Sequence, residues 1–200
     1  MKGSLIIVGF FVLGTICGVC HLLPFDIAET NISYYALCAL MFSVGLSVGN
    51  DPQTLKNFRS LNPRLVFLPI MTILGTLAGS AVVSLILTHR SLTDCLAVGS
   101  GFGYYSLSSI FITEYKGAEL GTIALLANIS REILTLLAAP LLVRWFGNLA
   151  PISAGGATTM DTTLPIITRT AGQQFVVVSI FHGFVVDFSV PFLVTLFCSI

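Results

Sequence analysis

Long apolar runs separated by short polar segments fill this chain of 200 residues, and two of the runs are interrupted near their centres. An apolar run of about 20 residues is long enough to cross a bilayer as a helix. The pattern therefore predicts seven membrane elements, of which the fourth and the sixth are broken. The expected elements cover residues 4–23, 32–48, 65–87, 94–113, 118–145, 151–168 and 175–200.

Both interruptions are rich in glycine and hydroxyl side chains. The first covers residues 99–103 and the second covers residues 155–161, where it ends on Asp161. In lipid, unwound backbone is tolerated only where it is buried in protein or lines a water-filled cavity. Paired interrupted helices are a sequence sign of a transporter's binding site. Close helix packing is the simpler explanation of the glycines, but three glycines in five residues exceed what packing requires.

Composition supports an all-α integral membrane protein. Hydrophobic residues make up 55% of the chain and charged residues only 9%, which is too little charge to cover a soluble domain. Nine acidic and nine basic residues cancel, so nothing indicates nucleic-acid binding. The spacing of the histidines and cysteines gives no metal motif, and no cofactor is expected. We expect one transporter domain over residues 1–200, with a three-helix unit at 1–90 and a core at 91–200.

The basic residues predict an orientation if all seven elements cross the membrane. Cytoplasmic segments carry an excess of lysine and arginine. With residue 2 in the cytoplasm, six basic residues fall inside, and Arg90 and Arg144 fall outside. The six are Lys2, Lys56, Arg59, Arg64, Lys116 and Arg169.

The fifth element carries a polar stripe that we expect to face the protein interior. Asn128, Glu132 and Thr135 fall at i, i+4 and i+7, on one face of a helix. Arg131 and Glu132 each cost about 2.5–3.5 kcal/mol at the centre of a membrane helix, so both need partners from other elements. Asp161 and Glu114 are the expected partners. A structural ion-pair network and a role in ion coupling both remain open for this group.

Each break exposes the ends of two half-helices. A half-helix that begins after Gly103 or Gly156 would present free N–H groups that suit a substrate carboxylate. Acids nearby would attract an ammonium group, Na⁺ or a proton. His182 is either a proton relay or a packed core residue. The candidate substrate ligands are Gly101, Gly103, Tyr105, Ser106, Glu114, Asn128, Glu132, Thr158, Thr159 and Asp161, and the candidates for ion coupling or structural pairing are Glu114, Arg131, Glu132, Asp161 and His182.

These motifs resemble the signatures of the LysO lysine exporter family. The resemblance lies in residues 100–108, in 156–165 and in the pairs Arg131-Glu132 and His182-Gly183, and it covers nearly the whole chain. It implies export of L-lysine, and of its analogue thialysine, across a bacterial inner membrane in exchange for protons. It also implies a multi-pass fold that is distantly similar to the bile-acid symporter and cation/proton antiporter folds.

Three departures from the family pattern qualify the resemblance. Family members usually begin with a further membrane region of about three helices, so a small companion membrane protein is an expected partner, besides a homodimer and membrane lipid. An acid often stands where this chain has Asn128. Asp187 lies outside the pattern, so the resemblance assigns it no role.

Other functions stay open on the sequence alone. One is an Na⁺- or H⁺-coupled carrier of another small amino acid or of a carboxylate. Another is a non-transporting subunit of a two-chain exporter. A membrane protease that uses two acids is the least favoured, because no catalytic motif surrounds Glu132 or Asp161. We therefore do not expect an enzyme.

Overall fold

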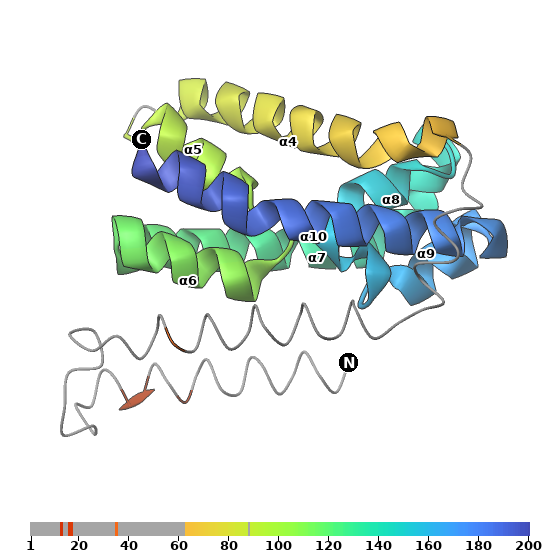
Figure 1. The fold of residues 1–200 in the computed structure, drawn as a ribbon. Helices are drawn as coiled ribbons and strands as arrows, with labels where there is room; N and C mark the ends of the chain where they lie inside the picture. The colour runs from red at the N-terminus through yellow and green to blue at the C-terminus, as the bar shows by residue number, and fades with distance from the viewer. Residues whose placement is uncertain (1–12, 14–15, 18–34, 36–62, 88) are drawn as a thin grey trace. The chain divides into compact units, whose positions relative to one another are not determined.

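The structure is a computed structural model, and it describes residues 63–87 and 89–200 together with positions 13, 16, 17 and 35. The elements expected at 4–23 and 32–48 lie outside the described residues. The chain divides into two units, Met1–Gly45 and Leu46–Ile200, and the second holds both breaks. Within residues 63–200, as far as they are described, all regular elements are helical (Figure 1).

Three of the described helices are long and apolar enough to cross a membrane. They match the expected third, fifth and seventh elements to within a few residues. Short 3-10 helices, η2 (Pro63–Val66) and η4 (Gln173–Phe175), precede the first and the last of them. The three are α4 (Phe67–Ile86), α7 (Ala118–Phe146) and α10 (Val176–Ser199).

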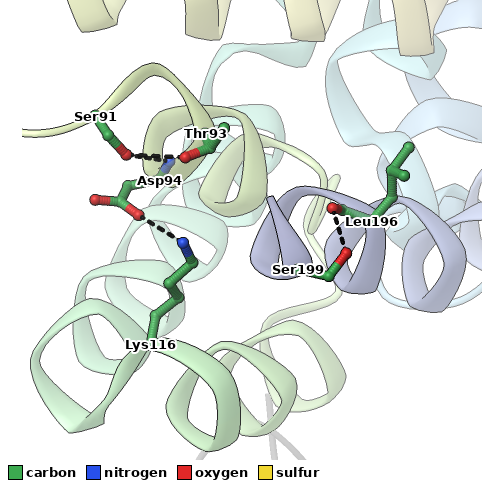
Figure 2. Close-up of polar contacts among 6 residues, drawn as sticks. All are labelled: Ser91, Thr93, Asp94, Lys116, Leu196 and Ser199. Atoms are coloured by element: carbon green, nitrogen blue, oxygen red, sulfur yellow. Dashed lines mark hydrogen bonds and ion pairs between the residues drawn. The ribbon is translucent and has the colours of Figure 1, made fainter.

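The fourth element is a hairpin that enters and leaves at one end of the unit, so the condition that all seven elements cross does not hold for it. It consists of α5 (Leu92–Gly99) and α6 (Tyr105–Lys116), joined by an unwound turn. The ammonium of Lys116, at the end of α6, lies 3.8 Å from the carboxylate of Asp94, at the start of α5 (Figure 2). Arg90, just before α5, pairs with Glu119, just after α6.

The sixth element is a second hairpin, and it enters from the opposite end. It comprises α8 (Ala150–Gly155), the 3-10 helix η3 (Gly156–Met160) and α9 (Leu164–Ala171). Ile152 near its start and Ala171 at its end share one apolar cluster with Val178 of α10. Both ends of the hairpin therefore lie beside the start of α10 (Figure 1). This element does not cross either.

Local sequence explains why α6 turns back. Gly117 has φ of +92°, a left-handed conformation that favours glycine, and it ends α6 where α7 begins. Four residues later, a Cβ on Gly121 would lie only 1.9 Å from the Thr113 hydroxyl oxygen. The absent side chain lets α6 and α7 pack closely as antiparallel neighbours.

The two hairpins change which basic residues share a side, although not the predicted orientation. Lys116 now lies at the same end as Arg90, and Arg144 lies at the same end as Arg169. The end that carries Arg64, Arg144 and Arg169 has no acidic residue among its described segments, whereas the other end holds Asp94, Glu114 and Glu119. The positive-inside rule still favours the first end as the cytoplasmic one, with three basic residues against Arg90 and Lys116 at the other, and the orientation stays a prediction.

Labelling of single cysteines tests this topology. In a background without the five native cysteines, His89→Cys and Ala118→Cys should react with a membrane-impermeant thiol reagent from one side only. Asn148→Cys and Gln173→Cys should react from the other side, because all four positions are exposed at the hairpin ends. Labelling of His89→Cys and Ala118→Cys from opposite sides would show that the first broken element crosses.

Candidate functional site

The tips of the two hairpins touch each other inside the unit. The carbonyl oxygen of Phe102, in the first tip, accepts a hydrogen bond of 2.9 Å from the N–H of Ala157, in the second. A Cβ on Gly156 would lie 2.2 Å from that same oxygen. Gly156 has φ of +64°, so both its conformation and the close approach require glycine. The two breaks thus form one structure.

Asn128 of α7 holds the first tip in place. Its amide oxygen accepts a hydrogen bond of 2.7 Å from the N–H of Gly103. Its amide nitrogen donates to the carbonyl oxygens of Ala124 at 2.9 Å and Val98 at 3.2 Å. Gly101 packs directly against this amide, where a Cβ would lie 2.4 Å from the nitrogen. Asn128 and Gly101, which we expected to bind substrate, therefore contact the protein itself.

Among the described residues, Arg131 bonds to carbonyl and hydroxyl oxygens and to no acid, which contradicts our expectation that Asp161 or Glu114 is its partner. Its guanidinium donates to the carbonyl oxygens of Ala154 at 2.8 Å and Ser153 at 3.1 Å. These are the last carbonyls of α8, where the helix dipole is negative. A further bond of 3.3 Å reaches the Thr76 hydroxyl of α4.

Phe102 packs beneath this guanidinium in a strained conformation. Its φ of +46° is unusual for a residue with a side chain, and its side chain is fully buried. The Arg131 guanidinium carbon lies 5.9 Å from the centre of the ring, within the range of a cation–π contact. Arg131 therefore stabilises both hairpins: it bonds to carbonyl oxygens of α8 in the second and packs on the Phe102 ring in the tip of the first.

Helix α10 holds the second tip through hydroxyl and imidazole groups. Thr159 and Ser179 exchange two hydrogen bonds, in which each hydroxyl donates to the other's carbonyl oxygen, at 3.0 and 2.8 Å. The His182 imidazole lies between two hydroxyl oxygens, with Nδ1 3.2 Å from Thr159 and Nε2 2.9 Å from Thr72 of α4. His182 is fully buried and links α10, η3 and α4.

Three carboxylates are connected by electrostatic interactions, and of these Asp161 is exposed while the other two are buried. Glu132 and Asp187 are each only 7% exposed. Glu132 lies beside the Thr162 hydroxyl, and its carboxylate is within electrostatic range of Asp161. Asp187 of α10 is within electrostatic range of Asp161 too. The three acids thus come from α7, from the segment after η3 and from α10, and we call them the acid cluster.

The start of α6 borders the acid cluster. Tyr105, its first residue, interacts electrostatically with Glu132 and Asp161, and Tyr104 interacts with Asp161 and Asp187. No hydrogen bond among the described residues uses the N–H groups of Ser106 or Leu107, as expected for the first turn of a helix. These N–H groups can bind an anionic group next to the three acids.

The second break differs from our expectation of a half-helix that begins after Gly156. A 3-10 helix follows Gly156, and α9 begins only at Leu164. The Thr158 hydroxyl donates to the carbonyl oxygen of Gly155 at 3.0 Å. The Thr159 hydroxyl, besides its contacts with α10, lies 2.8 Å from the carbonyl oxygen of Gly156. Asp161 accepts a hydrogen bond of 2.5 Å from the N–H of Thr162. The two threonine hydroxyls at the break therefore stabilise the tip.

Sequence reasoning placed some residues correctly and missed others. Asn128, Glu132 and Thr135 are buried on one face of α7, as their spacing predicts. Glu114 is exposed in the last turn of α6, about 14 Å along the helix from Tyr105, and it does not reach the breaks. Asp187 was not among the predicted site residues. Its signal was the helical spacing that puts it on the buried face of α10 with Ser179, His182, Gly183 and Val186.

A separate cavity of about 750 Å³ lies between α4, α5 and α7. Its lining is mainly apolar, and Arg131 and Asn128 contribute to its wall. None of the three acids lines it. In the described part of the chain, no group of His, Cys, Asp and Glu side chains is arranged to hold a metal ion. The acid cluster is the candidate functional site because two of its carboxylates are buried and none of the three forms an ion pair with a described residue.

Comparison with known proteins identifies the family. The family described as "Lysine exporter LysO" matches residues 8–198 of the chain. A protein of Haemophilus influenzae named "Putative lysine exporter" is 34% identical over 196 residues, which are 98% of this chain and 96% of that protein. The chain belongs to the LysO family.

A second relative of the same family is longer. The protein of Escherichia coli K12 named "Lysine exporter LysO" is 36% identical over 196 residues, and this chain spans 64% of its length. No solved structure matches the chain, so the likeness to bile-acid symporter and cation/proton antiporter folds stays a prediction. The family is one of transporters, which confirms the expectation that the chain is not an enzyme.

A substitution at Gly156 tests the contact between the tips. Gly156→Ala should lower the melting temperature of the purified protein by several degrees, because the added Cβ collides with the Phe102 carbonyl oxygen and disfavours the positive φ. Gly75→Ala in α4 is the matched control, since nothing lies within 4 Å of its Cβ. Equal melting temperatures for the two variants would contradict the contact.

A double substitution tests the partners of Arg131. Arg131→Met should cost about 1–3 kcal/mol of stability for each buried carbonyl that it leaves without a donor. If Arg131 instead balanced an acid, Asp161→Asn would restore the stability of Arg131→Met. We expect no such rescue when the denaturation midpoints of the single and double variants are compared. Rescue would mean that Arg131 is paired with Asp161.

Proposed function

We propose that the chain exports L-lysine by binding it at the acid cluster. The observation that carries the proposal is the excess of negative charge there. Arg131 is bonded to the carbonyls of α8, Lys116 pairs with Asp94, and Arg90 pairs with Glu119. Among the described residues, no lysine, arginine or histidine forms an ion pair with Glu132, Asp161 or Asp187. A cationic ligand would supply the missing positive charge.

The charged and polar groups of the site suit an amino acid. Buried carboxylates without a counter-charge are expensive in a membrane, and an ammonium group that pairs with them offsets this cost. The free N–H groups in the first turn of α6 suit the substrate carboxylate. Lysine carries one carboxylate and two ammonium groups, so it matches these features better than a neutral amino acid or an organic anion does. Thialysine carries the same charges and is expected to share the site.

Exchange with protons follows from the same chemistry. A proton on one of the carboxylates removes the charge that holds an ammonium group, so protonation releases lysine. Deprotonation restores the site for the next lysine. Coupling to a proton gradient across the inner membrane would then drive export. The assembly that the resemblance implies, either a homodimer or a complex with a small companion membrane protein, belongs to this proposal, and the mass of the purified complex tests it.

Transport by vesicles that contain the purified protein tests the proposal. Efflux of labelled lysine should require an opposing proton gradient, and unlabelled thialysine should compete. Glu132→Gln and Asp161→Asn should each reduce the rate at least about tenfold, because each removes a charge partner of the ammonium groups. Asp94→Asn, which changes an acid at the membrane surface, is the control with an unchanged rate. Unimpaired efflux in both site variants would refute the assignment.

A further inference from the structure

Asp187 is a buried acid for which neither the sequence motifs nor the contacts between the hairpins give a role. It lies on the buried face of α10, between Val186 and Val190, which are fully buried. Its side chain is 7% exposed and forms no hydrogen bond or ion pair with another described residue. A carboxylate in this state is costly inside a membrane unless a cation joins it.

Electrostatic interactions connect the three acids with the tyrosines at the start of α6. Tyr105 interacts with Glu132 and Asp161, and Tyr104 interacts with Asp161 and Asp187. Asp161 interacts with both of the other acids. Asp161 is therefore within electrostatic range of both of the other acids, and the tyrosines at the start of α6 connect it with Glu132 and with Asp187.

The register of α10 places Asp187 one helical turn beyond the contact with the second tip. Gly183 packs against the second tip, where its Cβ would lie 2.7 Å from the N–H nitrogen of Met160, the residue before Asp161. Asp187 follows four residues later, about 6 Å further along the helix axis. This rise is comparable to the reach of a lysine side chain from its α-carbon to its ammonium group.

We propose that Asp187 binds the side-chain ammonium of the substrate and so selects dibasic amino acids over neutral ones of the same length. This inference rests on the proposed function. The substrate carboxylate lies at the N–H groups of Ser106 and Leu107, and its α-ammonium group lies between Glu132 and Asp161. The side chain then extends past Tyr104, and Asp187 is the acid at its end. A neutral side chain would leave the Asp187 carboxylate without a partner.

Lysine and norleucine form the pair of probes that isolates this contact. Norleucine has the backbone and the four-carbon side chain of lysine, but it lacks the ammonium nitrogen that ends the lysine side chain. Binding of each labelled amino acid to the purified full chain in lipid nanodiscs gives two dissociation constants for every variant. The ratio of the two constants measures what the side-chain ammonium contributes to binding.

Two site variants should affect this ratio in different ways. Asp187→Asn should weaken lysine binding at least about tenfold and leave norleucine binding nearly unchanged, because only lysine presents a charge to Asp187. Asp161→Asn should weaken both ligands by similar factors, because both carry the α-ammonium group. Asp94→Asn should change neither constant. Asp187→Ser is a second test if Asp187→Asn has a lowered melting temperature.

The possible results separate this inference from the proposed function. If the unmodified chain binds lysine and Asp187→Asn keeps the lysine-to-norleucine ratio, the role of Asp187 is refuted while lysine transport stands. An unchanged ratio with an altered pH dependence of efflux would make Asp187 a proton carrier instead, which also overturns the inference. If the unmodified chain does not bind lysine, the proposed function fails, and the role of Asp187 fails with it.

Discussion

Everything in the described core depends on how two unwound stretches of backbone obtain their hydrogen bonds away from water. Each free N–H or C=O in the hydrocarbon region costs several kcal/mol, so a break persists only if the protein itself supplies the partners. The hydrogen bond from Ala157 to Phe102 joins the tips. The Asn128 amide accepts a hydrogen bond from the first tip, and α10 forms hydrogen bonds with the second. These contacts fix the position of the start of α6 beside the acids.

This requirement determines where the charges go. The arginine on α7 near the breaks, Arg131, donates its hydrogen bonds to the last carbonyls of α8, so it is not available to the carboxylates of the acid cluster. Neighbouring residues on a helix point in different directions, so Arg131 can bond to the carbonyls of α8 while Glu132 belongs to the acid cluster. The carboxylates therefore have no basic partner among the described residues, and this is the feature that the proposed transport of a cationic amino acid requires.

The sequence predicted much of this site, but it did not predict the path of the chain. Glycine clusters located both breaks, and helical spacing placed Asn128, Glu132 and Thr135 on a buried face. A break in the middle of an apolar run looks the same whether the chain continues across the bilayer or turns back, so the sequence alone did not decide between the two. Arg131 was expected to pair with a carboxylate, because a sequence shows which side chains are present but not which backbone carbonyls are free at a helix end. The role of Asp187 depends on which face of α10 meets the second tip, and this is a tertiary contact.

A structure determined with bound lysine tests the central claim most directly. The account predicts the lysine carboxylate at the first turn of α6, its α-ammonium group between Glu132 and Asp161, and its side-chain ammonium at Asp187. Lysine in the apolar cavity between α4, α5 and α7 would contradict it, and so would an acid cluster already neutralised by a basic residue from positions 1–62.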